Sequence, residues 1–151
     1  MSKAALLSVR PPYVERILAK EKRLEFRRVW VMKSISHVMI YATVPVQRIV
    51  AIAEISKVYE GSPTHLWRLA QKYGGGISRN ELYTYFKGKK TGYALKLGNI
   101  LSCDPPIDPT HIFVGFRAPQ SYYYLERKIV RRIEKMISSQ SGSNELARDR
   151  T

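Results

Sequence analysis

Residues 17–28 predict an abrupt change from helix to strand, and the rest of the chain is expected to be arranged around it. The helical pattern ends at Lys20, and from residue 23 apolar and charged residues alternate. Alternation places successive side chains on opposite faces of a strand, so Leu24 and Phe26 share one face. The other face carries the charged side chains Arg23, Glu25 and Arg27. A charged row beside a tight turn that holds Lys22 can line a polar cleft, and we take it as the expected functional centre.

The rest of the pattern predicts an α+β fold with a small, curved sheet. Two consecutive helices, capped by Ser62 and Ser78, separate strands, and no glycine-rich phosphate loop follows any strand. This order excludes a regularly alternating, doubly wound sheet. The expected strands are residues 4–9, 23–28, 37–43, 48–59 and 91–97, and a further helix is expected at 13–20. The length of 48–59 predicts a bend.

The C-terminal third is expected to end in a long helix. Residues 104–109 are predicted to form an irregular turn, and 111–116 a short strand or extended segment. Apolar residues recur at helical spacing from 120 to 137, and the polar stretch 138–151 predicts a flexible tail. The length fits one domain, residues 1–137 with the helix 120–137 included.

Charge is the strongest global signal. The 151 residues hold 26 Lys and Arg against 12 Asp and Glu, a net charge of +14. Such an excess favours polyanions, mostly nucleic acids in the cytoplasm, although charge can also serve solubility alone. The single cysteine, Cys103, excludes an internal disulfide and fits a cytoplasmic protein. No apolar run reaches the length of a membrane span, and no signal peptide is expected.

Several motifs resemble ASCH domains of the PUA-like superfamily. They are residues 7–13 (LSVRPPY), 17–22 (ILAKEK), 24–28 (LEFRR), 40–43 (IYAT) and 49–54 (IVAIAE). The resemblance spans roughly residues 4 to 100. It implies a small β-barrel with helices at its opening, here with an extra C-terminal helix. It also implies RNA binding and, for some members, regulation of transcription.

The resemblance extends to small amidohydrolases that act on N4-acetylcytidine, with one departure. Those enzymes carry Lys-x-x-Thr after the helix, and a Glu-Leu in a later helix. Here Lys22 matches, whereas Glu25 stands where they have the threonine nucleophile, and Glu81 aligns only loosely. Covalent amide hydrolysis needs an activated hydroxyl or thiol, for which the nearest hydroxyls are Ser8 and Thr43. Glu81 also has a structural explanation as the third residue of the Ser78 capping box.

The sequence therefore favours binding of RNA, or another nucleic acid, over catalysis. A basic cleft at the barrel mouth would admit a single base or modified nucleoside. The alternative is a hydrolase at the same cleft, either an amidohydrolase or a ribonuclease, in which Lys22, Glu25 and Glu81 would act. A third possibility is a protein-interaction adaptor or homodimer that uses the C-terminal helix. The cations expected to contact nucleic acid are Arg10, Lys22, Arg23, Arg27, Arg28, Lys87, Lys89, Lys90, Arg127 and Arg131.

Neither a metal nor a cofactor is expected. His37, His65 and His111 are far apart in the sequence and lack partner ligands at metal-binding spacing. The charged row also has a simpler interpretation, namely a solvated ion-pair network on an exposed strand face. The tyrosines at 122–124 could stack on bases, although packing is the preferred role for Tyr122. The triplet 74–76 (GGG) lies between helices and is interpreted as a hinge.

Overall fold

The computed structural model describes residues 3–30 and 34–149. These residues form six strands and four α-helices, in agreement with the predicted α+β class. Their order is β1 (Ala4–Val9), α1 (Pro11–Leu18), β2 (Leu24–Arg27), β3 (His37–Ala42), β4 (Arg48–Gly61), α2 (Pro63–Tyr73), α3 (Arg79–Tyr85), β5 (Gly92–Ile107), a 3-10 turn (Pro109–His111), β6 (Tyr122–Leu125) and α4 (Arg127–Asp149).

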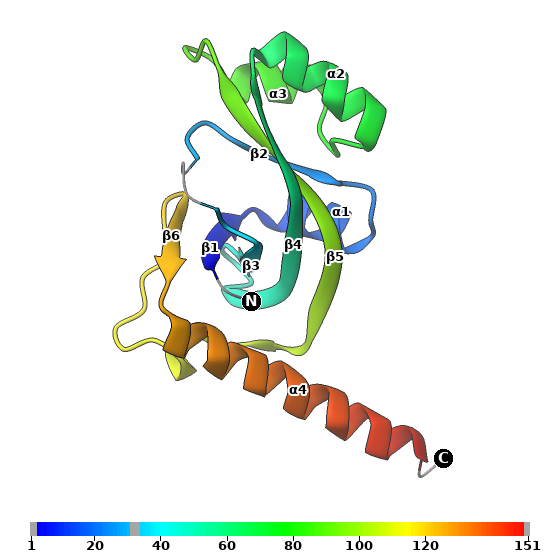
Figure 1. The fold of residues 1–151 in the computed structure, drawn as a ribbon, viewed down its shortest axis with the longest axis vertical. Coiled ribbons are helices and arrows are strands. Elements are labelled where there is room, and N and C mark those ends of the chain that lie inside the picture. Colours follow the sequence, from blue (N-terminus) through cyan, green and yellow to red (C-terminus); the bar gives the residue numbers. More distant parts are fainter. Residues whose placement is uncertain (1–2, 31–33, 150–151) are drawn as a thin grey trace.

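All six strands belong to one sheet, in the order β2-β5-β4-β3-β1-β6. Only β1 and β3 run parallel, and every other neighbouring pair is antiparallel. The sheet curls into a half-barrel, with β2 and β6 as its two edges (Figure 1). Register shifts within β4 fall at Ile49/Ala51, Ala53/Ile55 and Ile55/Lys57. Such irregularities increase local twist and bend a strand, as the length of this segment predicted.

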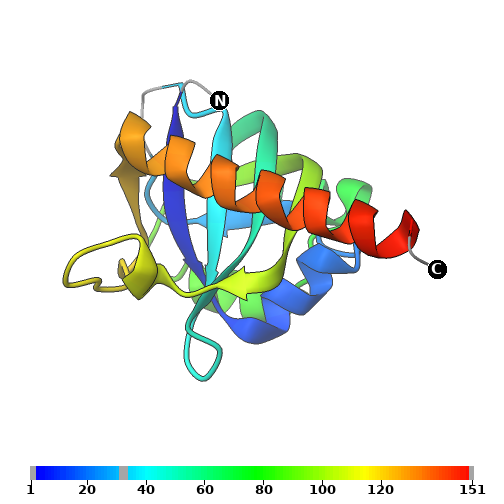
Figure 2. The same cartoon turned by 90° about the horizontal axis from the view of Figure 1, so that it is seen from below.

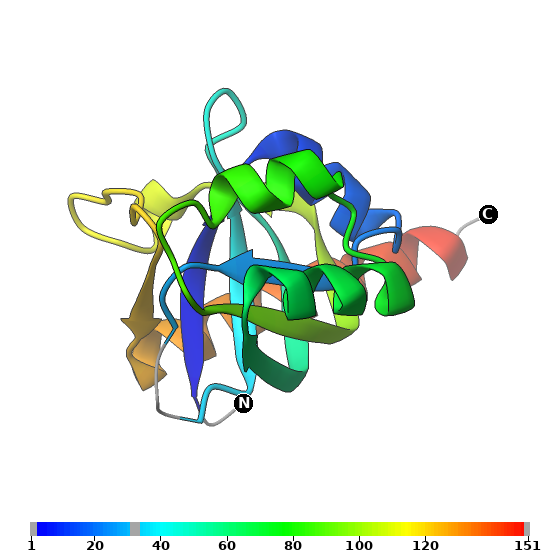
Figure 3. The same cartoon turned by 90° about the horizontal axis from the view of Figure 1, so that it is seen from above.

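Helices cover the sheet on two sides, and the core divides accordingly. β1 is buried on both faces, because Leu7 and Val9 point into the curl of the sheet while Leu6 packs beneath α4. Figure 2 shows α4 lying across β1 and β3. On the other side of the sheet, Leu24 and Phe26 of β2 pack under α2 and α3. Figure 3 shows these two helices beside β2.

The turn between α1 and β2 depends on one residue with left-handed backbone. Lys20 has φ 62°, and the N–H groups of Glu21 and Lys22 both donate to the carbonyl of Arg16, at 2.9 and 3.0 Å. These bonds satisfy the carbonyl at the end of the helix and reverse the chain. The charged row therefore begins directly beneath α1.

The end of β5 differs from the prediction. The strand continues to Ile107, whereas we expected a turn at residues 104–109. Ile107 pairs with Ile49 and Ser102 with Ala51, so the prolines at 105 and 106 lie in the bulge between these pairs. Proline cannot donate to a ladder but suits extended backbone, which is why a bulge tolerates it.

The start of the C-terminal helix was also predicted wrongly. Tyr122–Leu125 forms β6 against β1, and α4 begins only at Arg127. Aromatic residues suit a strand once a neighbouring edge offers hydrogen bonds, and β1 supplies that edge. Residues 111–116, expected to be a short strand or an extended segment, do not form a strand: a 3-10 turn ends at His111, and the next strand begins at Tyr122.

α4 packs on the sheet and extends beyond its predicted end at residue 137. Val130, Ile133 and Ile137 are buried against Leu6 and other residues of the sheet. The helix continues to Asp149, so the stretch predicted as a flexible tail is helical to that point, and residues 150–151 lie outside the described residues. No helix in residues 3–30 and 34–149 is long and apolar enough to cross a membrane. A homodimer through α4 stays a prediction.

Shortening Ile133 tests whether α4 is integral to the fold. Ile133 is fully buried, and its replacement by alanine removes apolar contacts and leaves a cavity. We expect Ile133→Ala to lower the free energy of unfolding by about 2–5 kcal/mol, measured by denaturant titration. Arg132→Ala, on the exposed side of α4, is the control and should change stability by less than about 0.5 kcal/mol. Equal stability of the two variants would contradict the observed packing.

Candidate functional site

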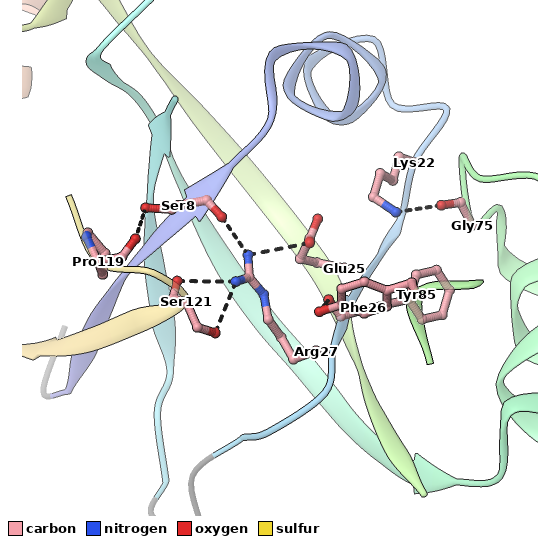
Figure 4. Close-up of polar contacts among 9 residues, drawn as sticks. All are labelled: Ser8, Lys22, Glu25, Phe26, Arg27, Gly75, Tyr85, Pro119 and Ser121. Carbon is pink, nitrogen blue, oxygen red and sulfur yellow. Dashed lines mark hydrogen bonds and ion pairs between the residues drawn. The ribbon is translucent and has the colours of Figure 1, made fainter. Parts of the chain in front are cut away.

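Three of the charged side chains predicted at residues 22–27 are buried, whereas Arg23 is exposed. Lys22, Glu25 and Arg27 are only 2%, 7% and 5% exposed. Leu24 and Phe26 pack beneath α2 and α3, so Glu25 and Arg27 point to the opposite side, between β2 and β1 (Figure 4). The interpretation as a solvated ion-pair network is therefore wrong, because these charges are removed from water.

Arg27 connects the two edges of the half-barrel. Its Nη1 donates to the carbonyl and Oγ of Ser121, at 3.1 and 3.3 Å, and its Nη2 donates to the carbonyl of Ser8 at 3.0 Å. Ser8 lies in β1 and Ser121 immediately before β6. Nη2 also lies 3.4 Å from Oε1 of Glu25, which supplies the opposite charge. β2 and β6 are the two edge strands of the sheet, so no backbone ladder joins β2 to β1 or β6. The guanidinium of Arg27 supplies hydrogen bonds across this gap instead.

Two polar atoms of this row lack a partner. Oε2 of Glu25 and Nε of Arg27 are buried and make no hydrogen bond within the described residues. An unpaired buried polar atom costs about 1–3 kcal/mol. One hydrogen-bond acceptor and one donor therefore remain unsatisfied in this row.

Lys22 is held by groups from three elements. Its Nζ donates to the carbonyl of Gly75 at 2.7 Å and lies 5.2 Å and 4.8 Å from the ring centres of Tyr13 and Phe26. A Cβ on Gly76 would come within 2.5 Å of Cβ of Lys22, so only glycine permits this approach. Burial lowers the pKa of Lys22, and the charge of Glu25 opposes that shift.

A more exposed layer surrounds the lysine. The hydroxyl of Tyr13 donates to Oε2 of Glu81 at 2.6 Å, and Arg16 lies over the Tyr13 ring while donating to the carbonyl of Gly76 at 2.8 Å. Burial and the contact with Glu81 raise the pKa of Tyr13 to about 12. The hydrogen bond from Tyr13, followed by one from Ser78, lowers the pKa of Glu81.

Glu81 has two roles in this geometry. Its backbone N–H donates to Oγ of Ser78 at 3.1 Å, which confirms the predicted cap of α3. Its carboxylate meanwhile contacts Tyr13, and its charge acts on Lys22. The structural and functional explanations of Glu81 therefore do not exclude each other.

The remaining predicted cations do not gather on one face. Arg10 and Arg23 are exposed next to α1 and β2, and Arg28 donates to the carbonyls of Tyr85 and Lys87 at 2.7 and 3.0 Å. Lys87, Lys89 and Lys90 follow α3 in the turn that Arg28 contacts. Arg127 and Arg131 are exposed on α4, at the other end of the molecule from α2 and α3 (Figure 1).

Of the two hydroxyls considered as nucleophiles, that of Ser8 is engaged elsewhere. Oγ of Ser8 donates to the carbonyl of Pro119 at 2.6 Å, and Thr43 is half-buried after the end of β3. Within residues 3–30 and 34–149, no serine or threonine hydroxyl hydrogen-bonds to Lys22 or Glu25. The same residues include no group of three histidine, cysteine or acidic side chains placed to hold a metal ion.

Sequence reasoning missed Tyr13, Arg16 and Gly75 as members of the site. Tyr13 and Arg16 share a helix face, and this spacing beside Lys22 was the available signal. The glycine triplet, interpreted as a hinge, supplies carbonyl acceptors to Arg16, Lys22 and the backbone N–H of Arg23. Only the fold brings it against the turn after α1.

A curled six-stranded sheet with helices at its opening is the PUA-like architecture that the resemblance implied. No family model matches the chain. The chain is 27% identical over 145 residues to an ASCH domain-containing ribonuclease of Zymomonas mobilis, covering 90% of this chain and 93% of that protein.

Solved structures agree with this similarity. The crystal structure of ASCH from Zymomonas mobilis superposes with a TM-score of 0.81 at 25% identity, covering 89% of this chain and 95% of that one. A variant of that protein with phenylalanine in place of a tyrosine gives a TM-score of 0.80 at 25% identity, covering 89% and 98%. In sequence and in fold the chain is thus similar to ASCH domain proteins.

The titration of Lys22 tests the described electrostatics. We expect its pKa, followed by NMR of labelled lysine side chains, to lie below the usual 10.5, because burial disfavours the charged amine. Glu25→Gln should lower it further and Arg16→Gln should raise it, since these charges act in opposite directions. Folded Lys22 then binds its proton more weakly than the unfolded chain does, so its contribution to stability grows as pH rises toward 10.5. Glu126→Gln, remote on the surface, is the control; an ordinary pKa for Lys22 would contradict its burial.

Proposed function

We propose that the protein binds single-stranded RNA and holds one unstacked base or nucleoside at the Lys22–Glu25–Arg27 row. The observation that carries this proposal is the buried, unpaired pair of atoms, Oε2 of Glu25 and Nε of Arg27. The similarity to a protein named a ribonuclease supports an RNA-related function at the level of the family.

The chemistry of the row suits a nucleobase edge. Oε2 of Glu25 can accept a hydrogen bond from an exocyclic amino group, and Nε of Arg27 can donate to a ring nitrogen or carbonyl oxygen. Hydrogen bonds to ionised groups are stronger than neutral ones. The base would approach past Tyr13, which is half-exposed and contacts both Lys22 and the exposed Glu81.

The exposed cations would position the strand without reading its sequence. Near the row these are the exposed Arg10, Arg23, Lys87 and Lys90, together with the half-buried Arg28 and Lys89. Arg127 and Arg131 would form a separate contact on α4. Regulation of transcription or of RNA use would follow from binding without cleavage.

Cleavage of RNA is the second candidate, favoured by the name of the relative and by the lowered pKa of Lys22. In this reaction a base takes the proton of the 2′-hydroxyl, and the 2′-oxygen forms a bond to the adjacent phosphorus. The bond from phosphorus to the 5′-oxygen breaks, and an acid protonates that oxygen. Lys22 with Glu25 or Glu81 would supply the acid and base, and Arg16 would stabilise the charge on phosphate.

Hydrolysis of acetylated cytidine has less support. Glu25 occupies the position of the threonine nucleophile, and the hydroxyl of Ser8 points to Pro119 (Figure 4). A carboxylate could still activate water, so this activity belongs in the same assay.

Salt dependence of RNA affinity tests the binding proposal. Between about 50 and 200 mM salt the affinity for a single-stranded oligonucleotide, measured by fluorescence anisotropy, should fall by at least tenfold. Arg23→Gln should reduce the salt slope by about 0.7, because it removes one phosphate contact to a single strand. Glu25→Gln should weaken binding about tenfold with an unchanged slope, since it removes a base contact. Glu126→Gln, an exposed carboxylate, is the matched control. Absent or salt-independent RNA binding would refute the proposal.

Incubation with single-stranded RNA tests the second candidate. Cleavage should require the 2′-hydroxyl, so a deoxy oligonucleotide should stay intact. Lys22→Met and Glu25→Gln should each slow cleavage by at least about 100-fold if they act as acid and base. Circular dichroism should first establish that the variants fold. Equal rates in wild type and both variants would point to a contaminating nuclease. If the RNA stays intact, cleavage is refuted and only the binding proposal stands.

A further inference from the structure

Two tyrosines and three lysines form a cluster on the surface above β4, β5 and α2. The rings of Tyr59 and Tyr73 stack with centres 6.1 Å apart at 28°. Lys57 Nζ lies 4.8 Å from the Tyr59 ring centre, whereas Lys72 and Lys96 lie 5.2 and 4.2 Å from that of Tyr73. We call these five residues the tyrosine–lysine cluster.

The cluster concentrates the positive charge of three lysines on one surface. Lys57 and Lys96 are direct partners across the β4–β5 ladder, and like charges at opposed positions destabilise a sheet. In the described part of the chain, none of the three lysines forms an ion pair. The ring contacts offset some of this repulsion, about 0.5–1 kcal/mol each at an exposed site. A purely structural patch would gain more from a carboxylate beside the lysines, which would neutralise the repulsion.

The cluster continues directly from the candidate site. Tyr73 precedes the glycine triplet, whose Gly75 carbonyl holds Lys22. Lys96 pairs with Leu24 across β2 and β5, and the N–H of Leu97 donates to the carbonyl of Arg23 at 2.9 Å. The exposed Arg23 therefore lies between the buried row and the cluster.

We propose that the tyrosine–lysine cluster is a phosphate-binding subsite for the backbone of the RNA strand as it leaves the site at Lys22. This inference rests on the proposed RNA binding and adds the path that the RNA takes from Lys22 across the surface. Lysine ammonium groups bind phosphates as compact point charges, and the tyrosine rings hold these groups close together. Such contacts fix position and carry no sequence information. A polyanion with closely spaced charges suits two directly opposed lysines.

The test compares long and short RNA in a triple variant, Lys57→Gln, Lys72→Gln and Lys96→Gln. For an oligonucleotide of about 15 nucleotides the salt slope should fall by about two, because single strands lose about 0.7 per phosphate contact. Its affinity at low salt should fall at least tenfold, whereas a dinucleotide, which reaches only the row, should bind equally to both proteins. Tyr73→Leu keeps all three charges but removes a ring, and should weaken binding of the long RNA a few-fold with the slope retained.

A charge-matched control separates this subsite from net charge. Lys3→Gln, Lys128→Gln and Lys135→Gln remove three exposed lysines elsewhere and should change the affinity for long RNA by less than threefold. An equal loss in both triple variants, or an unchanged slope in the cluster variant, would overturn the subsite while leaving RNA binding intact. Failure of the wild type to bind RNA would overturn the proposed function and the subsite together. Preferential loss of binding to an acidic peptide would assign the cluster to a protein partner instead.

Discussion

The closure of the half-barrel depends on the guanidinium of Arg27. The sheet order leaves β2 and β6 as unpaired edges, and Arg27 joins them by donating to carbonyls at Ser8 and Ser121. Arginine suits this role because one rigid fork offers five donors. A buried guanidinium also needs a nearby negative charge, which Glu25 provides at 3.4 Å. The need for a negative charge beside Arg27 thus places the carboxylate of Glu25 inside the fold, where its second oxygen remains unpaired.

Such a row stabilises a protein poorly. Desolvation of buried charges offsets most of their attraction, and apolar replacements of similar volume are often at least as stable. Here two cations, Lys22 and Arg27, share one buried carboxylate, and the pKa of Lys22 is lowered by burial. Two further polar atoms lack partners. Such an arrangement in an otherwise apolar interior agrees with the ligand-binding role proposed above for the row.

Local sequence patterns predicted the helices and strands around the site. Contacts between residues distant in the sequence determine which of its side chains are buried. The caps by Ser62 and Ser78 and the alternation in β2 follow from neighbouring residues, and the structure has them. Burial of Arg27 could not be predicted, because the covering residues before β6 come from 94 positions further along the chain. The same β1 edge turned Tyr122–Leu125 into a strand despite its helical spacing. Strand alternation assigns side chains to faces, but only the tertiary fold decides which face meets water.

The end of α2 links the buried row to the molecular surface. Tyr73, its last residue, carries Lys96 over its ring, and the next three residues contact the turn after α1. Gly74 accepts from the backbone of Arg23 at 2.7 Å, Gly75 accepts from Lys22, and Gly76 packs against the Lys22 side chain. The triplet has no side chains that could adjust independently, so its backbone position fixes that of Lys22. An anion bound by the lysines around Tyr73 would therefore act on the glycine triplet that holds the buried amine of Lys22. Three residues would thus couple charge on the surface to the interior of the site.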